Sequence, residues 1–216
     1  MPMKCNSGRI DKIMQEPLLH SSRRHGLLVW LTGLSGSGKT TLAQSLHAQW
    51  PDAHQPVMLL DGDVLRRGLC ADLGFSEQDR AENMRRVGHV AELFLQQGFI
   101  VLAAFISPLE QDRMRVRQIV GASYMLEVYV RCSLQECERR DVKGLYRRAR
   151  AGTIPAFTGI SAPYEVPQVP DLVLDTEHHD LATCTRQALN AIRARLQNPP
   201  HHADVPIHPD GYPTHL

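Results

Sequence analysis

Residues 27–32 read LLVWLT and are followed without a break by GLSGSGKT at residues 33–40. The first six residues favour a buried strand, and the next eight match G-x-x-x-x-G-K-[ST] at every position. Leu42, Leu46 and Trp50 then recur at the spacing of an amphipathic helix. The sequence therefore predicts a nucleoside-triphosphate site at a strand-to-helix turn.

Each residue type in this turn has a chemical reason to be there. Glycines let backbone N–H groups turn inward around phosphate oxygens, and the N-terminus of the helix presents its dipole to the same anion. Lys39 can reach the β- and γ-phosphates, and the Thr40 hydroxyl can ligate Mg²⁺. ATP and Mg²⁺ are therefore the expected cofactors, and the expected ATP-binding residues are Gly33, Leu34, Ser35, Gly36, Ser37, Gly38, Lys39, Thr40 and Thr41.

Short apolar runs alternate with helical patterns along the rest of the chain. Strands are expected at 27–32, 57–61, 99–106, 126–131 and 172–174, and helices near 39–50, 77–97, 109–120, 134–140 and 181–196. Near-continuous apolar strands separated by helices predict a parallel sheet covered on both faces, in a three-layer doubly wound α/β domain of the P-loop type. We expect one domain over residues 26–197, a flexible leader at 1–25 and a flexible tail at 198–216.

Composition excludes several classes of partner. The chain has 216 residues, 43% of them hydrophobic and 22% charged, with a formal net charge of +1. This near-neutral balance favours neither nucleic acid nor an anionic membrane, and no apolar run approaches the ~18 residues of a membrane span. The five cysteines are an odd number without a Cys-x-x-Cys pair, and no secretory signal is visible. A reduced, cytoplasmic protein is expected.

Asp61-Gly62-Asp63 follows the second expected strand. Ligands of open α/β sheets bind beyond the carboxyl ends of the strands, so these two carboxylates are candidates for a metal and for an acceptor hydroxyl. A carboxylate with an ordinary pKa near ~4 is a weak base for an alcohol, but it can orient the hydroxyl and accept its proton late. Capping of a following helix is the alternative role for an aspartate at this position.

Among the classes that use such a phosphate loop, a small-molecule kinase fits best. A GTPase switch would carry Asn-Lys-x-Asp to read guanine, and an ATP-driven motor would carry an apolar strand ending in Asp-Glu; the sequence has neither. Asp141-Val142-Lys143-Gly144 matches the loose Asp-x-x-Gly pattern of a switch, but it follows a polar helical stretch instead of a strand.

Residues 143–170 begin with basic side chains and continue with many glycines and prolines. This composition fits two interpretations equally well. One is a mobile lid that covers an anionic ligand, and the other is a solvated basic helix that leads into an ordinary loop.

Four blocks outside the phosphate loop resemble the adenylyl-sulfate kinase family, and the similarity extends from about Gly26 to Leu196. The blocks are LDGD with Arg66 (60–66), DLGFS with DRAEN and two arginines (72–86), FISP (105–108), and DVKGLY through ARAG, FTGI and PYE (141–165). The resemblance implies transfer of the γ-phosphate of ATP to the 3′-hydroxyl of adenylyl sulfate (APS), which gives PAPS. Another hydroxylated metabolite as acceptor, or a regulatory module with a degenerate kinase site, are the alternatives.

The resemblance also implies roles for individual residues. Phe75 and Phe157 would stack on the two faces of the APS adenine, with the core of the domain as the alternative place for both rings. Asp63 would face the hydroxyl, and Lys143 would bridge donor and acceptor. The implied catalytic residues are Lys39, Asp63, Ser107 and Lys143, and the implied acceptor contacts are Asp63, Arg66, Phe75, Arg80, Asn83, Ile106, Ser107, Lys143, Phe157 and Thr158.

Three further expectations complete this comparison with the family. The matching serine of the family is described as a phosphoserine intermediate, but no base that would activate Ser107 lies near it in the sequence. Val64 and Ser161 replace an asparagine and an aspartate of the family pattern. The metal ligands expected are Thr40 and, beside it, Asp61, and the expected assembly is a homodimer.

Overall fold

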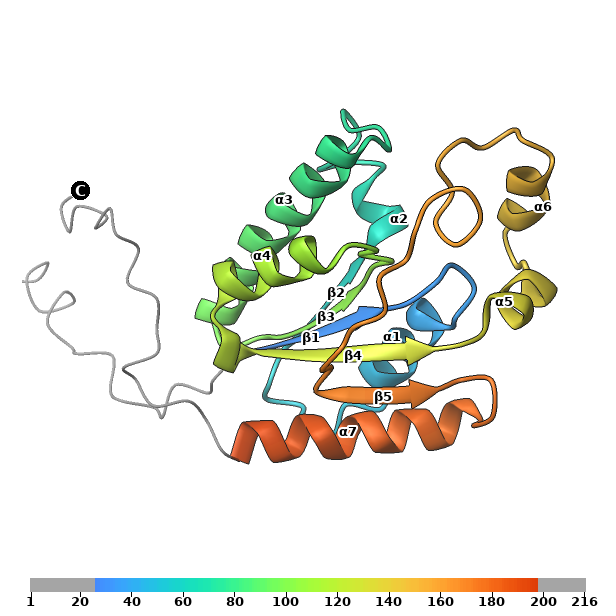
Figure 1. Cartoon of the computed structure of the whole chain (residues 1–216). Helices are drawn as coiled ribbons and strands as arrows, with labels where there is room; N and C mark the ends of the chain where they lie inside the picture. The colour runs from blue at the N-terminus through green and yellow to red at the C-terminus, as the bar shows by residue number, and fades with distance from the viewer. Residues whose placement is uncertain (1–25, 198–216) are drawn as a thin grey trace, which may run out of the picture.

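The computed structural model describes residues 26–197, so the expectations for the leader at 1–25 and the tail at 198–216 lie outside the described residues. Five parallel strands form one sheet in the order β2-β3-β1-β4-β5. Their bounds are β1 Leu27–Thr32, β2 Val57–Asp61, β3 Ile100–Ala104, β4 Met125–Arg131 and β5 Leu172–Asp175. The predicted doubly wound α/β fold is confirmed (Figure 1).

The central strand β1 explains why the sheet is covered on both faces. Leu27, Val29 and Leu31 point into one apolar cluster, whereas Leu28 and Trp30 point into another. Successive side chains of a strand alternate between faces, so a strand that is apolar at every position needs a partner layer on each side. All six residues of β1 are buried.

Helices supply these two layers. Helices α1 (Lys39–Ala48) and α7 (Leu181–Gln197) contribute Leu42 and Ile192 to the first cluster. Helices α3 (Glu77–Gln96) and α4 (Glu110–Val120) contribute Val87 and Val116 to the second. Figure 1 shows α7 on one side of the sheet and the α3–α4 pair on the other.

Element boundaries differ from the sequence-based expectation at a few points. The third strand was expected at 99–106 but ends at Ala104, and the first helix ends at Ala48, before Trp50. Beyond β3 the chain turns into the cavity described below, and Ser107 has a φ of 38°, which a continuing strand would not allow. Besides α5 (Leu134–Arg140), which was expected, the structure contains the short helices α2 (Gly62–Leu65) and α6 (Leu145–Arg150) and a 3₁₀ turn at Ala122–Tyr124.

The strand order places the phosphate-loop candidate at the reversal point of the sheet. The chain leaves β1 towards β2 on one side of the sheet, and it leaves the neighbouring strand β3 towards β4 on the other side. Crevices at the carboxyl ends of strands beside such a point are where open α/β sheets bind ligands. None of the helices between residues 26 and 197 is long and apolar enough to cross a membrane.

Removal of the Leu102 side chain tests this two-layer core. Leu102 lies on β3 with no exposed surface, so Leu102→Ala should lower the free energy of unfolding by about 2–5 kcal/mol through lost burial and the cavity left behind. Leu93→Ala on α3 is the control, because Leu93 is 62% exposed and its loss should change stability by only about 0.5 kcal/mol. Urea denaturation measures both, and equal effects would contradict the assigned core.

Candidate active site

The loop between β1 and α1 depends on glycine for its shape. Gly36 and Gly38 have φ values of 78° and 95°, in the left-handed region that other residues rarely adopt. A Cβ on Gly36 would also lie 3.1 Å from the carbonyl oxygen of Cys137. Helix α1 starts directly after Gly38 without a side-chain cap, so its first backbone N–H groups face the loop. This is the arrangement that binds phosphate oxygens.

Lys39 places a buried ammonium group inside this loop. Its Nζ donates to the carbonyl oxygens of Gly33 at 2.9 Å and Leu34 at 2.6 Å, and the residue is only 8% exposed. Burial disfavours the charged form and lowers the pKa of Lys39 from 10.5 to about 8. The nearby Lys143 ammonium acts in the same direction, whereas the Asp63 carboxylate opposes it. The charged form of Lys39 is therefore destabilised in the free protein, and a bound anion would stabilise it.

Asp61 joins the loop to the end of β2. The Thr40 hydroxyl donates to its Oδ2 at 2.7 Å, and its Oδ1 accepts from the backbone N–H of Asp63 at 2.9 Å. The second bond caps α2, so the capping role considered for this position is present. Asp61 and Thr40 also offer two hard oxygen atoms side by side, the donor type that Mg²⁺ prefers.

No group of three or more His, Cys, Asp or Glu that could hold a metal ion occurs within residues 26–197. A pair of oxygen ligands nevertheless fits Mg²⁺, which keeps several waters and takes its remaining ligands from substrate phosphates. The residues present are therefore compatible with a metal that arrives together with a nucleotide.

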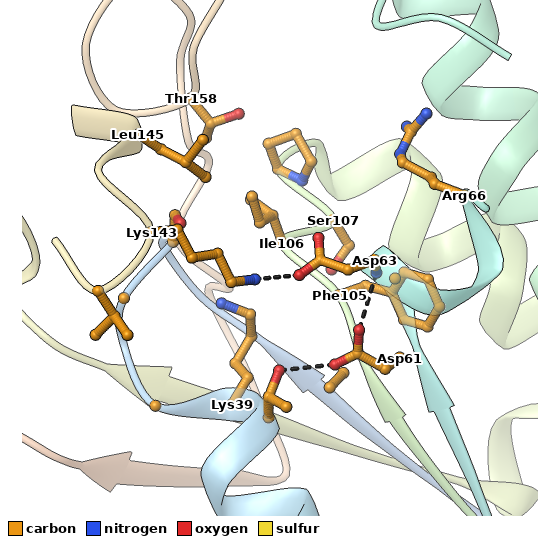
Figure 2. Close-up of a pocket in the computed structure, with 18 of the residues that line it drawn as sticks. Lys39, Asp61, Asp63, Arg66, Phe105, Ile106, Ser107, Lys143, Leu145 and Thr158 are labelled. Carbon is orange, nitrogen blue, oxygen red and sulfur yellow. Dashed lines mark hydrogen bonds and ion pairs between the residues drawn. The ribbon is translucent and has the colours of Figure 1, made fainter. Parts of the chain in front are cut away.

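Asp63 and Lys143 form an ion pair across the mouth of the site (Figure 2). Lys143 lies in the short link between α5 and α6, where Asp141 accepts from the backbone N–H groups of Tyr146 and Arg147 and so fixes the start of α6. Asp141 follows a helix, as expected, and not a strand. Figure 2 shows the ammonium groups of Lys39 and Lys143 close together, on the same side of Asp63.

A single cavity of about 1190 Å³ runs from this loop to the space between α3 and the 153–158 segment. The residues that were expected to contact the acceptor all line it: Asp63, Arg66, Phe75, Arg80, Asn83, Ile106, Ser107, Lys143, Phe157 and Thr158. Of the expected ATP-binding residues, Ser35, Gly36, Gly38, Lys39, Thr40 and Thr41 line it. Gly33, Leu34 and Ser37 do not; their oxygens instead lie around the Lys39 ammonium.

Two arginines flank Phe75 at the far end of the cavity. The guanidinium carbons of Arg66 and Arg80 lie 4.4 and 5.8 Å from the centre of its ring. Arg80 also donates to Thr158 Oγ1 at 3.3 Å and to the Ala156 carbonyl oxygen at 2.9 Å, which joins α3 to the opposite wall. Burial, followed by the like charge of Arg66, lowers the pKa of Arg80. This end of the site is therefore positively charged and partly dehydrated.

The two phenylalanines differ in their surroundings. Phe75 is 63% exposed and presents its ring to the cavity. Phe157 is buried and packs edge-on against Tyr146, with 5.1 Å between the ring centres. The Phe75 ring is therefore accessible for stacking on a ligand. The Phe157 ring packs in the core against Tyr146 and also lines the cavity.

Ser107 is buried in a network of hydrogen bonds. Its hydroxyl donates to Thr32 Oγ1 at 2.9 Å and accepts from Trp30 Nε1 at 3.1 Å, and the residue is 2% exposed. The Thr32 hydroxyl can in turn donate to the Ile106 carbonyl oxygen at 2.8 Å. None of these partners is a base that would remove the Ser107 proton.

The segment 143–170 contains a basic helix and a loop that lines the cavity. It begins with the basic helix α6 and continues as a loop whose residues Thr153–Thr158 line the cavity. Its far end is held by a bond from the backbone N–H of Glu165 to the Pro108 carbonyl oxygen at 2.8 Å and by Arg113, which donates to the Glu165 carbonyl oxygen at 2.9 Å. The segment therefore lines the cavity and is held at its far end by these hydrogen bonds. Figure 1 shows its course from α6 back towards β5.

The two departures from the family pattern lie at the edges of this site. Val64 is exposed and lines the cavity beside Asp63. The Ser161 hydroxyl accepts from the backbone N–H of Phe157 at 3.0 Å. Ser161 thus retains an oxygen acceptor that fixes the lid turn, without the charge of an aspartate.

Four of the cavity residues were not singled out from the sequence: Asp112, Arg140, Thr176 and His179. Arg140 donates to the Thr176 carbonyl oxygen at 2.7 Å, and the Thr176 hydroxyl donates to the Ser37 carbonyl oxygen at 2.7 Å. These contacts join α5 and the end of β5 to the phosphate loop. The contacts of Arg140 and Thr176 could not be predicted from local sequence patterns, because they join residues that are distant in the chain.

Comparison with known proteins gives a consistent result. A profile of the family described as adenylylsulphate kinase matches residues 25–175. A probable adenylyl-sulfate kinase of Bacillus subtilis is 49% identical over 184 residues, 85% of this chain and 93% of the relative. An adenylyl-sulfate kinase of Paraburkholderia xenovorans is 57% identical over 156 residues, 72% of this chain and 87% of the relative. The solved structure of the Mycobacterium tuberculosis APS kinase CysC, in complex with AMPPNP and APS, is similar with a TM-score of 0.75 and 44% identity, covering 78% of this chain and 98% of that one.

The lowered pKa of Lys39 predicts how stability changes with pH. Between pH 8 and 10.5 the unfolded chain holds a proton at Lys39 that the folded protein has lost, so stability rises with pH across this window. Relative to Lys39→Met, the wild-type free energy of unfolding should rise by about 3 kcal/mol from pH 7 to above 10. Denaturation of both proteins across this range measures the difference, and parallel profiles would show that the ammonium is not destabilised.

Proposed function

Because the chain belongs to the adenylyl-sulfate kinase family, we propose that the cavity described above holds ATP and adenylyl sulfate together, with the residues named above in distinct roles. The chain is an ATP-dependent phosphotransferase of sulfate assimilation, which passes the γ-phosphate of ATP to the 3′-hydroxyl of adenylyl sulfate. The main support for these roles is that residues of the phosphate loop and the expected acceptor residues line one continuous cavity.

The donor half of the site is the loop at residues 33–41. Backbone N–H groups of the loop and the N-terminus of α1 bind the phosphate oxygens, and Lys39 binds the β- and γ-phosphates. Its ammonium is already present at the centre of the loop and exchanges carbonyl partners for phosphate oxygens. Thr40 and Asp61 would hold Mg²⁺, which neutralises charge on the phosphates.

The acceptor half lies between α3 and the lid. Phe75 and Phe157 hold the adenine, and base–aromatic stacking contributes ~1–3 kcal/mol per base. Arg66 and Arg80, with Asn83, bind the phosphosulfate and ribose, since planar guanidinium groups suit such oxyanions. The contacts of Arg80 with Ala156 and Thr158 support this role, because they place the cation against the lid residue that follows Phe157.

Transfer takes place between these halves. Asp63 orients the 3′-hydroxyl and accepts its proton, while Lys39 and Lys143 neutralise the charge that develops on the moving phosphoryl group. The ion pair between Asp63 and Lys143 connects the lid to the acceptor side. Closure of the lid therefore also brings Lys143 next to Asp63. Direct in-line transfer is favoured over a phosphoserine, because Ser107 is buried and has no base.

The surroundings of the enzyme are also part of the proposal. We expect a cytoplasmic protein, since the described cysteines Cys70, Cys132, Cys137 and Cys184 are all free thiols. We expect a homodimer, because homodimers are common in the family. Analytical ultracentrifugation of the full chain tests the assembly, and a monomer at micromolar concentration would contradict it.

One assay tests the assigned reaction. The full chain is mixed with Mg–ATP and either adenylyl sulfate, AMP or gluconate, and the products are separated by ion-exchange chromatography. We expect PAPS from the first mixture and little transfer in the other two. Equal transfer to AMP would show that the sulfate is not recognised, and transfer to gluconate would favour a different hydroxylated acceptor.

Replacement of Asp63 by Asn tests its role as the acid that faces the hydroxyl. Asp63→Asn keeps the size of the side chain but removes the proton acceptor, so kcat should fall by about 10²–10⁴-fold. The KM for adenylyl sulfate should change far less, because the amide still accepts a hydrogen bond. Steady-state kinetics separate the two quantities, and a change confined to KM would make Asp63 a binding residue.

Replacement of Arg80 by Ala tests the division of the cavity. Arg80→Ala removes charge-assisted hydrogen bonds worth ~1.5–3 kcal/mol each, so the KM for adenylyl sulfate should rise by about tenfold or more. The KM for ATP should stay near the wild-type value. Arg85→Ala is the matched control on the same helix, because Arg85 pairs with Glu82. Equal effects on both substrates would refute the assigned halves.

A further inference from the structure

The wall of the cavity between α3 and α4 contains two buried oxygen atoms without a hydrogen-bond donor. Among residues 26–197, the buried side-chain atoms without a hydrogen-bond partner are Trp50 Nε1, Asn83 Oδ1, Asp112 Oδ2, Arg113 Nε and Glu127 Oε1. The last two form an ion pair at 3.0 Å, and Trp50 packs against the cluster beneath α1 and α7. Asn83 and Asp112 are the two that line the cavity.

Both side chains are deeply buried. Asn83 is 3% exposed in the second turn of α3, and Asp112 is 2% exposed in the first turn of α4. A buried acceptor that loses its water without gaining a donor carries the full cost of desolvation. Buried polar groups are therefore almost always paired, and an exception at the wall of a substrate cavity indicates that the substrate brings the donor.

The neighbouring cations do not supply that donor. Arg80 donates to the carbonyl oxygens of Phe75 and Ala156 and to Thr158. Arg113 directs its N–H groups to Ser107, Glu110 and Glu165. These two guanidinium groups, with Arg115, stabilise the Asp112 carboxylate only through space.

The balance of charge at Asp112 follows from these positions. Burial is the largest effect and raises the pKa of Asp112, and the Glu77 carboxylate adds to it. Arg115, Arg113 and Arg80 oppose the rise. A donor group that bonds to Asp112 would relieve the desolvation that burial imposes.

The chemistry of adenylyl sulfate restricts which part of it can meet this wall. The phosphate and sulfate oxygens are acceptors and have no proton to offer at neutral pH. The donors are the 6-amino group of adenine and the ribose hydroxyls, and the 3′-hydroxyl is already assigned to Asp63. The 6-amino group and the 2′-hydroxyl remain.

We propose that Asp112, beside Asn83, accepts a hydrogen bond from the nucleoside part of adenylyl sulfate and so selects this acceptor over nucleotides that lack the donor. This inference rests on the acceptor site proposed above. Asp112 thereby acts as a specificity-determining residue, and a ligand without the donor leaves a buried carboxylate unpaired. A site that hydrogen-bonds a donor of the substrate discriminates strongly against analogues without that donor, whereas an apolar pocket discriminates only weakly between ligands of different size.

Binding of two analogues to the full chain tests this role. Inosine 5′-phosphosulfate replaces the 6-amino group by an oxygen atom, and 2′-deoxyadenosine 5′-phosphosulfate lacks the 2′-hydroxyl. Calorimetry should show that the wild-type protein binds adenylyl sulfate at least about tenfold more tightly than one of them. In Asp112→Leu this ratio should fall towards one, because two methyl groups replace the carboxylate oxygens on a side chain of the same branching.

Gln111→Ala is the matched control, since Gln111 is the exposed neighbour on α4 and bonds to Glu77 at 3.4 Å. It should retain the wild-type ratios. If Asp112→Leu does not fold, Asp112→Asn replaces one acceptor oxygen by an amide donor at unchanged shape, and a smaller ratio is again expected.

Three results would overturn the proposal: equal wild-type affinity for all three ligands, unchanged ratios in the Asp112 variants, or an equal loss of affinity for all three. Arg80→Ala separates this failure from that of the site itself. If Arg80→Ala leaves the affinity for adenylyl sulfate unchanged, the acceptor site is misplaced. If it weakens binding while the Asp112 variants keep their ratios, only the role of Asp112 is wrong.

Discussion

A buried positive charge at the turn from β1 into α1 is the constraint on which the rest of the site depends. The Lys39 ammonium is held by the carbonyl oxygens of its own loop at 2.6–2.9 Å. Left-handed glycines at 36 and 38 are needed to wrap the backbone so closely, and the apolar strand β1 is needed to hold the loop at the centre of the sheet. The protein thus maintains a destabilised cation that a triphosphate neutralises.

The remaining charges are arranged around this one so that two substrates can meet. Asp61 accepts a hydrogen bond from Thr40 at the start of α1. Figure 2 shows the Asp63–Lys143 pair above Asp61, where the proposed acceptor half begins. The lid contributes Lys143 at its start and Phe157 near its middle, while its far end is fixed to the loop after β3. In the proposed reaction one segment carries residues for both halves of the cavity, so its closure over the substrates would exclude water from a loose phosphoryl-transfer transition state.

Local sequence patterns were sufficient for most of the fold and for the phosphate loop. Continuous apolar strands, glycine spacing and helical periodicity are short-range signals, and β1, β2, α3 and α5 begin and end within one residue of the expected positions. The end of β3 was placed two residues too late, because Phe105 and Ile106 are apolar but serve the cavity and the adjacent core instead of the sheet. Arg140, Thr176 and Asp112 could not have been identified, since their significance arises from contacts between distant elements.

In the proposed site, ATP and adenylyl sulfate share one cavity and react without a covalent intermediate on the protein. The stereochemistry of phosphoryl transfer distinguishes this reaction from one that passes through a phosphoserine. With ATP made chiral at the γ-phosphorus by oxygen isotopes, a single in-line displacement inverts the configuration of the phosphoryl group in PAPS, and inversion is the predicted result. Retention would require two displacements, which would mean that a protein group such as the Ser107 hydroxyl carries the phosphoryl group and that this account of the site is wrong.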